Sequence, residues 1–395
     1  MAVLYFWRKQ TRMKYLRQHW QEAFFLLILS AVWFAIGWVI RDYSLTSNQD
    51  VALFAQARQE LLDNFALEMP PSNELTYTAV RSMVDQLDDP YAAFLEPVVA
   101  NRFRADYTGD SGVVGLFPEK INGEFVITIV LPGGGAEEAG VQEGDVLLSI
   151  DGFALDETAT EGDAALLLRG PVGSAAQLVV RRGNEVLEFA PVRAVRSVTT
   201  NLQMLDGDVA YFAHHTFTSN APDEVGNALD NLLAQNPKAI IWDMRSNGGG
   251  SMEAAESILS YFIEDGLLFT AELKGDQVRE FVSNGDGRAA DIPLVVLVGE
   301  HTFSAAETSA ASIQDRQRGT LIGETTFGKG TIQNTAPLVG GSALQYTIAK
   351  WLSPNGTWYD GIGVSPDIEV TDDPATSEDE VLQFALEYLR EEVGD

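Results

Sequence analysis

Apolar segments typical of strands alternate with helical segments from Arg196 to the end of the chain. Strand patterns cover residues 209–217, 239–244 and 293–298, and helical patterns cover 221–235 and 252–263. Strands that alternate with helices predict an α/β layer architecture. A helix after Ser304 and strands over 321–325 and 343–351 complete the predicted layers.

Length and composition limit the classes of protein and of site. With 395 residues, 46% of them hydrophobic, the chain can bury more than one core, so two or three domains are expected. The absence of cysteine excludes disulfides, thiolate metal sites and a cysteine nucleophile. A formal charge of -31 argues against nucleic acid as a partner, because phosphate backbones require basic surfaces. No metal or other cofactor is expected.

The N-terminus combines a basic segment with an apolar one. Residues 23–40 form 18 consecutive uncharged positions, just long enough to span a bilayer as a helix. By the positive-inside rule, the basic residues 1–22 stay in the cytoplasm and everything after Arg41 lies across the membrane. A cleaved signal peptide is the alternative, but bulky Trp33, Phe34 and Trp38 leave no small-residue cleavage site. We therefore expect a retained membrane anchor.

Residues 41–107 have a helical pattern, including an apolar stripe over 51–65. The pair Asp89-Pro90 is expected to end one helix and begin a turn. Asp88 and Asp89 then fit a solvated helix cap better than a metal-binding pair.

Residues 108–195 are expected to form a small β-rich module. Strand patterns over 125–130, 145–151 and 176–182 are bounded by turns that contain glycine. The order of GAEEAG, GDVLLSIDG and LRGPVG resembles a PDZ domain, although Gly135 stands where that family usually has proline. The resemblance implies that Val114, Gly115 and Leu116 bind the C-terminal carboxylate of a peptide added to the sheet edge.

A serine and a lysine are the candidate catalytic pair. Ser304 precedes a helical stretch, so free N–H groups at the helix N-terminus would favour negative charge developing near its hydroxyl. Lys329 lies between two glycines and beside Phe327 and Ile332. A lysine shielded from water can lose its proton near neutral pH and then accept the serine proton.

Lys329 lies 25 positions after Ser304, and Gln333 follows 4 positions later. Together with the runs IIWDMRSNGGG and SPNGTWYDGIGVSPDIEV, this spacing resembles the carboxy-terminal processing peptidases, tail-specific serine proteases with a Ser/Lys dyad. The resemblance covers about residues 75–390 and implies a crotonase-like protease core with an inserted PDZ domain. In that family the segment matching Leu87–Tyr91 is structural.

The glycine run after Asn247 is the candidate oxyanion hole. The family resemblance assigns the N–H groups of Gly249 and Ala305 to the tetrahedral oxyanion, and Gly248 replaces the usual proline. A simple strand-to-helix turn is the alternative. Gln333 is expected to orient the Lys329 amine, with a surface strand position as its alternative role.

Asp243 and Arg245 are expected to form a buried ion pair. A Ser-His-Asp triad would need His214 or His215, which are adjacent on a predicted strand and therefore point to opposite faces.

At the C-terminus, a helix is expected within 372–395, with Ser377 and Glu380 in capping-box spacing. One face carries Val381, Phe384, Ala385, Tyr388 and Leu389 and would pack on the protein's own core or on a second subunit. A homodimer is one expectation.

The sequence predicts an α/β (α+β multidomain) protein. Its parts are a basic segment (1–22), a transmembrane helix (23–40), a helical region (41–107), a PDZ domain (108–195), a catalytic core (196–371) and a C-terminal helix (372–395). The predicted function is a membrane-anchored, extracytoplasmic (periplasmic) serine endopeptidase acting on proteins or peptides with apolar C-termini. The alternatives are an inactive membrane-tethered PDZ scaffold and an acyl-group hydrolase.

Overall fold

The computed structural model describes residues 30, 32–34, 49–130, 134–155, 159, 161–195, 197–373, 376 and 378–393. The chain divides into two compact units, Met1–Thr78 and Ala79–Asp395, which are described separately. The predicted basic segment 1–22 and nearly all of the predicted span 23–40 lie outside the described residues. Within the described part of the chain, no helix combines the length and the apolar character needed to cross a membrane.

In the first unit, α2 (Gln49–Asn64) confirms the helical pattern predicted there. Its apolar stripe is solvent-exposed, with Leu53 67% and Phe54 47% accessible. A second helix, α3 (Ser72–Asp85), begins in this unit and continues into the next.

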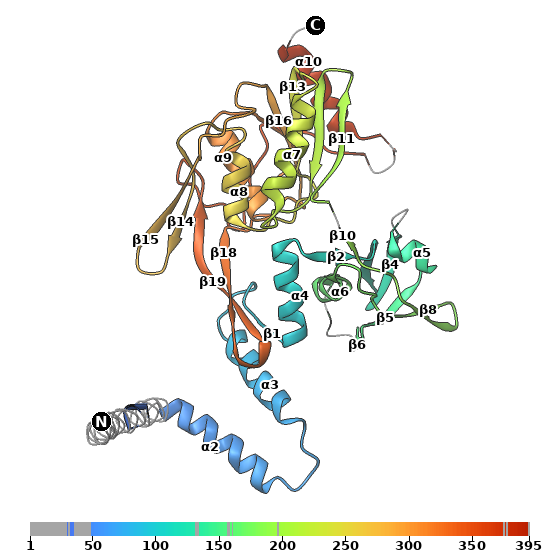
Figure 1. The fold of residues 1–395 in the computed structure, drawn as a ribbon, viewed down its shortest axis with the longest axis vertical. Coiled ribbons are helices and arrows are strands. Elements are labelled where there is room, and N and C mark those ends of the chain that lie inside the picture. Colours follow the sequence, from blue (N-terminus) through green and yellow to red (C-terminus); the bar gives the residue numbers. More distant parts are fainter. Residues whose placement is uncertain are drawn as a thin grey trace, which may run out of the picture. The chain divides into compact units, whose positions relative to one another are not determined.

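The larger unit contains the predicted α/β layers (Figure 1). Its main sheet has the order β11-β12-β13-β16-β17-β20. These strands are β11 (Thr199–Leu205), β12 (Val209–His214), β13 (Ala239–Asp243), β16 (Leu294–Val298), β17 (Thr320–Gly323) and β20 (Ile368–Glu369). All neighbouring pairs are parallel except β11–β12.

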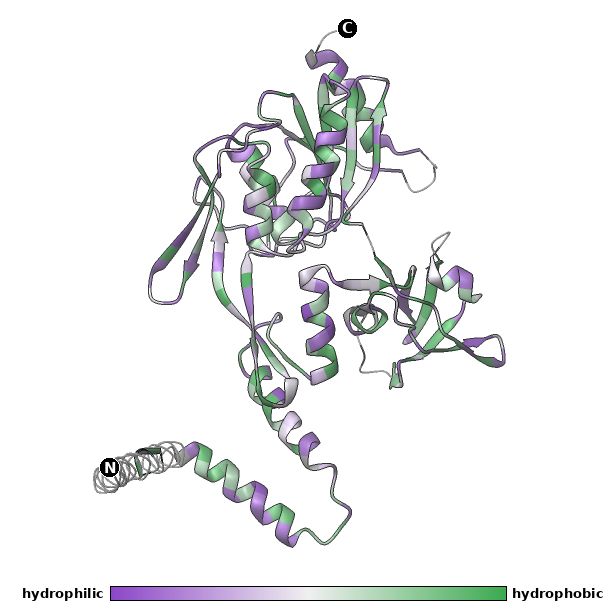
Figure 2. Ribbon diagram, in the orientation of Figure 1, coloured by the Kyte–Doolittle hydropathy of each residue, from purple (hydrophilic) through white to green (hydrophobic). Residues whose placement is uncertain are grey.

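Two hydrophobic cores cover the two faces of this sheet. Ile240 and Trp242 of β13 face the core that includes α7 (Ala221–Leu233), α8 (Met252–Leu259) and α9 (Ala305–Asp315). Ile241, between them, faces the core that includes α10 (Glu380–Val393). A parallel strand buried on both faces is apolar along its whole length, so these strands are largely green in Figure 2.

A second, antiparallel sheet carries the order β1-β19-β14-β15, with β18 also pairing β19. Its strands are β1 (Ala93–Leu95), β14 (Leu267–Leu273), β15 (Gln277–Val282), β18 (Thr331–Pro337) and β19 (Ala343–Leu352). A short 3₁₀ helix, η1 (Val339–Gly341), connects β18 to β19. Strand β1 precedes the β-rich module in the sequence but pairs with β19 near the end of the chain.

The β-rich module folds around a separate core that includes Phe125, Ile127, Leu147 and Leu178. Its sheet has the order β3-β4-β5-β8-β9, and β6 pairs with β5. The strands are β3 (Leu116–Ile121), β4 (Glu124–Val130), β5 (Val146–Ile150), β6 (Phe153–Ala154), β8 (Leu178–Arg182) and β9 (Glu185–Phe189).

Further elements surround this module. Helix α5 (Gly135–Ala139) follows β4, and α6 (Glu161–Leu168) packs on the edge strand β3. Helix α4 (Pro97–Thr108) leads into a small sheet of β10 (Ala194–Val195), β2 (Ser111–Val113) and β7 (Gly170–Pro171). Glycine is required at 135, since a Cβ there would lie 2.2 Å from the Val192 carbonyl oxygen.

Several predicted boundaries were wrong. The strand expected over 209–217 ends at His214, and the helix expected over 252–263 ends at Leu259. Ser377 lies outside the described residues, and α10 is capped by Asp379, whose Oδ1 accepts the Leu382 N–H at 2.8 Å.

The face of α10 that packs on the protein's own core includes Val381, Ala385 and Leu389, as predicted, and Tyr388 is partly buried against the same core. Phe384, which was predicted on the same face, is 37% exposed. The domain boundaries expected at 107, 195 and 371 stay predictions.

Candidate active site

Ser304 lies in the loop between β16 and α9, directly before the first residue of the helix. Its backbone has a positive φ of 57°, with a ψ of −114° that lies outside the commonly populated regions. This conformation is costly for a residue with a Cβ and persists only where neighbouring contacts hold it. Three hydrogen bonds hold it here: the Ser304 N–H donates to Glu307 Oε2 at 2.7 Å, and the Ser304 carbonyl oxygen accepts the Thr308 N–H at 2.9 Å and the Thr308 hydroxyl at 3.2 Å.

Glu307 is fully buried and connects the two candidate catalytic residues. Its Oε2 accepts the backbone N–H groups of Ser304, at 2.7 Å, and Lys329, at 2.9 Å. Its Oε1 accepts the Thr326 hydroxyl and the Gly328 N–H. The sequence analysis assigned no role to this glutamate. Its position three residues after Ser304, a capping-box spacing, was the signal available.

Lys329 extends its amine between aromatic rings. Its Nζ lies 4.6 Å from the ring centre of Tyr91 and 4.9 Å from that of Phe303. Burial lowers the pKa of Lys329 to about 8, although the negative charges of Glu307 and Asp89 favour the ammonium. Its carbonyl oxygen accepts the indole N–H of Trp351 at 2.7 Å. The predicted shielding of the Lys329 amine from water therefore has a structural basis.

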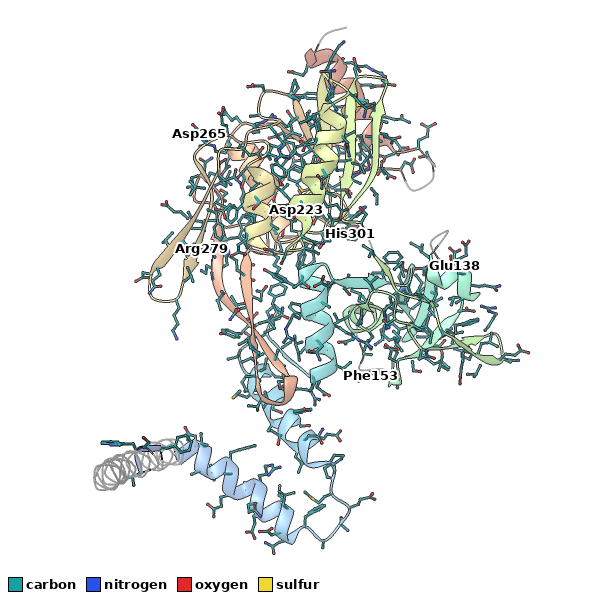
Figure 3. All side chains as sticks on the ribbon, viewed as in Figure 1. Glu138, Phe153, Asp223, Asp265, Arg279 and His301 are labelled. Carbon is teal, nitrogen blue, oxygen red and sulfur yellow. The ribbon has the colours of Figure 1, made fainter. Side chains whose placement is uncertain are left out.

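One cavity of about 800 Å³ is lined by most of the candidate residues. Ser304, Lys329, Gln333 and Gly249 all line it. Apolar side chains of α8, β14 and β15 and part of α4 also line it, and Arg279 of β15, labelled in Figure 3, contributes a charged group. The cavity is large enough for several residues of an extended chain.

The amide of Gln333 is turned toward two threonines. Its Nε2 donates to the hydroxyl oxygens of Thr331 and Thr347, both at 3.0 Å. Its Oε1 accepts no hydrogen bond from the residues that the structure describes. Gln333 therefore lines the cavity from β18 with one free acceptor, and its predicted role toward Lys329 stays a prediction.

The two predicted oxyanion donors are adjacent in space. A Cβ at Gly249 would lie 2.9 Å from Ser304 Cβ and 3.0 Å from the Ala305 nitrogen, so glycine is required here. The Ala305 N–H has no hydrogen-bond acceptor within the described residues. The Gly249 N–H, in contrast, donates to Asn247 Oδ1 at 2.9 Å, so it is already satisfied.

Asn247 is a further site residue that the sequence analysis did not single out. It is fully buried, and its Nδ2 donates to the His214 carbonyl oxygen at 2.9 Å. Its own carbonyl oxygen accepts the Phe303 N–H, so it connects the glycine run to the residue before Ser304. An asparagine before glycines typically bonds the backbone two residues on, which was the available signal.

The expected ion pair of Asp243 and Arg245 is present, at 2.8 Å. Arg245 also pairs with Asp379 at 2.8 Å, which connects the segment before the glycine run to the start of α10. Asp243 also accepts the Tyr211 hydroxyl at 2.9 Å.

The histidine alternative is not supported for His214. Its ring is fully buried, packs against Phe217 and Trp242, and donates from Nε2 to the Thr216 carbonyl oxygen. Burial lowers the pKa of His214 to about 3.

The other two described histidines differ in exposure. His215 lines the cavity with Nε2 bonded to the Thr200 hydroxyl at 2.7 Å, so the two adjacent rings do diverge as predicted. His301, labelled in Figure 3, has a 78% exposed side chain. Across the described residues, no group of three or more histidine, aspartate or glutamate side chains could hold a metal ion.

The predicted peptide-binding loop leads into an edge strand. Val114 is buried, and its carbonyl oxygen accepts the Ala136 N–H at 2.7 Å. Gly115 has a φ of 79°, and Leu116 begins β3 at the edge of the sheet, beside α6. An edge strand next to a helix is the arrangement to which a peptide adds as a further strand.

The comparisons agree with this arrangement. A model of peptidase family S41 matches residues 208–370, and a PDZ domain model matches residues 126–182. A carboxyl-terminal-processing protease of Synechocystis is 36% identical over 325 residues, which are 80% of this chain and 75% of that protein. The chain belongs to the carboxyl-terminal-processing proteases of this family.

Two further comparisons are consistent with that membership. The chloroplastic carboxyl-terminal-processing peptidase 2 of Arabidopsis thaliana is 35% identical over 320 residues, 76% of this chain and 62% of that protein. The structure of the photosystem II D1 C-terminal processing protease matches with a TM-score of 0.55 at 28% identity, covering 86% of this chain and 91% of that one. The predicted family, serine-type peptidase class and PDZ domain are thus confirmed.

Proposed function

We propose that this protein is a serine endopeptidase that cleaves protein substrates held near their C-terminus, with Ser304 as nucleophile and Lys329 as base. One observation carries the proposal. The buried Glu307 carboxylate binds the backbone N–H groups of both residues, and both line the same cavity. The two backbone positions from which the hydroxyl and the amine extend are therefore attached to a common rigid anchor, which favours a reproducible geometry between them.

In the proposed reaction, Ser304 Oγ attacks the scissile carbonyl carbon while the neutral Lys329 amine takes the hydroxyl proton. The free Ala305 N–H stabilises the tetrahedral oxyanion. The Gly249 N–H contributes to this once its hydrogen bond to Asn247 is shared or released. The Lys329 ammonium then gives its proton to the leaving amine, and water hydrolyses the acyl-enzyme.

Gln333 has a supporting role in this proposal. Its free Oε1 accepts a hydrogen bond from the Lys329 ammonium, while the two threonine hydroxyls hold its amide in place. This would direct the amine lone pair toward Ser304 once the proton has left.

The PDZ domain would bind the substrate tail. The free edge of β3 and the loop at Val114, Gly115 and Leu116 would receive an apolar C-terminus and its carboxylate. The names of the relatives, which refer to carboxyl-terminal processing, support a substrate of this kind.

Four finer features are part of the same proposal. Residues 23–40 anchor the chain in a membrane. The protease and PDZ domains, which follow this apolar segment, lie on the extracytoplasmic side, because the basic residues that precede the segment stay in the cytoplasm. The core is crotonase-like, and the protein acts as a homodimer. A fusion of a topology reporter after Arg41 tests the orientation, and light scattering of the purified protein tests the dimer.

The full-length protein in detergent tests the enzymatic proposal. We expect wild type to degrade an unstructured protein with an apolar C-terminus, and Ser304→Ala and Lys329→Ala to leave it intact. Amidation of the substrate's C-terminus should slow cleavage by weakening tail binding. Equal lack of cleavage by wild type and Ser304→Ala would instead indicate a tethered PDZ scaffold, and turnover of small esters alone would indicate an acyl-group hydrolase.

A further inference from the structure

A turn from the N-terminal part of the larger unit lies against Lys329. Asp89 Oδ1 accepts the Tyr91 N–H at 3.0 Å, and the Asp89 carbonyl oxygen accepts the Ala92 N–H at 3.1 Å. Pro90 occupies the second position of this turn, where its restricted φ is favourable. The turn predicted at Asp89-Pro90 is thus present, and it presents Tyr91. Asp89 itself, expected to be a solvated helix cap, instead accepts backbone N–H groups of Tyr91 and Thr347.

This turn is attached to the same sheet that carries the active-site strand β18. Asp89 Oδ2 accepts the Thr347 N–H of β19 at 3.3 Å. Immediately after the turn, β1 pairs with β19, where Ala93 is opposite Gln345. Strand β19 in turn pairs with β18, which begins two residues after Lys329. The position of Tyr91 relative to Lys329 is therefore set by regular sheet pairing.

The Tyr91 ring covers one side of the Lys329 amine. Its centre lies 4.6 Å from Nζ, and the Phe303 ring lies 4.9 Å from Nζ. The two rings contact each other edge to face, with centres 6.4 Å apart. The lysine amine is thus enclosed by one ring from the residue before Ser304 and one from the turn before β1.

Two opposing effects act on the amine at this place. The faces of the rings attract an ammonium ion, and so do the carboxylates of Glu307 on α9 and Asp89 on the turn. Exclusion of water disfavours the ammonium and is the larger effect, since the pKa of Lys329 is lowered overall. Burial and the charges of Asp360, Glu307 and Asp89 raise the pKa of Tyr91 itself, so its hydroxyl stays neutral.

We propose that Tyr91 is a positioning residue of the active site, whose ring covers the Lys329 amine and keeps water from it. The inference rests on the proposed role of Lys329 as base. The chain segment before the PDZ domain then completes the environment of the base, although the catalytic pair itself follows that domain in the sequence.

The rate of Ser304 acylation by a fluorophosphonate probe, measured from pH 6 to 10.5 on the full-length protein, tests this. The acylation rate of the wild type should reach half of its maximum near pH 8, because it rises as the Lys329 amine loses its proton. Tyr91→Ala should raise the midpoint by about one unit, which lowers the rate at pH 8 about fivefold and leaves it nearly unchanged at pH 10.5. Tyr91→Phe is the matched control, because it keeps the ring, and should keep the wild-type midpoint.

A purely structural role for Tyr91 would lower the rate by the same factor at every pH and leave the midpoint in place, which would overturn the inference. A shifted midpoint in Tyr91→Phe would overturn it too, because the hydroxyl and not the ring would then be responsible. If Tyr91→Ala does not fold, Tyr91→Leu should show a smaller upward shift, because the shorter side chain leaves part of the amine uncovered. Undiminished labelling of Lys329→Ala would refute the proposed base itself, a result separate from any effect of Tyr91.

Discussion

Replacement of Glu307 by glutamine tests the anchor that joins the candidate nucleophile and base. The carboxylate accepts four hydrogen bonds from Ser304, Lys329, Thr326 and Gly328, and no part of it reaches solvent. An amide offers one acceptor oxygen in place of two, so its NH₂ group must face one of the two pairs of donors. The less costly orientation directs it toward Thr326, whose hydroxyl can rotate to accept.

In that orientation, the Gly328 N–H loses its acceptor in a buried place, which costs about 2 kcal/mol. The bonds from Ser304 and Lys329 change from charged to neutral acceptors, at a loss of about 1 kcal/mol each. We therefore expect Glu307→Gln to lower the free energy of unfolding by about 4 kcal/mol. A displacement of the proposed Ser304–Lys329 dyad by about 1 Å would also slow acylation on the order of 100-fold.

Urea unfolding followed by tryptophan fluorescence measures the first effect, because Trp242 and Trp351 are both fully buried in the core of this unit. Labelling by a fluorophosphonate measures the second. Glu324→Gln provides a matched control, since Glu324 is exposed and its replacement should change the unfolding free energy by less than about 0.5 kcal/mol. A loss below about 1 kcal/mol in Glu307→Gln, with acylation unchanged, would refute the role of this carboxylate as the common anchor.

Two further predictions concern charges elsewhere in the larger unit. Asp89→Asn keeps an oxygen to accept the Tyr91 N–H but removes a negative charge that favours the Lys329 ammonium. The midpoint of the pH profile of acylation should therefore fall below about pH 8. A rise of the midpoint would contradict the electrostatic argument. Arg193 is 3% exposed and donates hydrogen bonds to Asp151 and to the carbonyl oxygens of Leu168 and Ala175. Arg193→Met should therefore destabilise the PDZ domain by about 3 kcal/mol. Hydrogen exchange of the core amides of this domain measures the loss. Unchanged protection of those amides would show that the arginine is dispensable.

The elements that the sequence predicted well are those whose pattern is local. The continuous apolar runs at β13 and β16 indicated strands covered on both faces, and the structure has a core on each side of them. The helix after Ser304 and the β-rich module were predicted for the same reason. Errors concentrated at element ends, as at Leu259, where the apolar pattern continues to Ile263 but the chain turns to reach β14.

The candidate site was predicted in part. Ser304 and Lys329 were singled out from their surroundings, and Gln333 and the glycine run from the resemblance to a family; all of them line one cavity in the structure. The asparagine before the glycines was the only signal that Asn247 accepts the Gly249 N–H, and whether this hydrogen bond forms depends on the side-chain rotamer within a buried loop.

The sequence by itself determined most of the segments that form strands or helices, because this property depends on near neighbours in the chain. The candidate catalytic residues came from the sequence as well, through their resemblance to a family. Only the tertiary structure decided what surrounds the amine of Lys329. Tyr91 and Lys329 are more than two hundred positions apart, and the pairing of β1 with β19, together with the hydrogen bond from the Thr347 N–H to Asp89, brings the ring and the amine together. The pKa of a lysine depends on how much water reaches it, and that is a property of packing between distant segments.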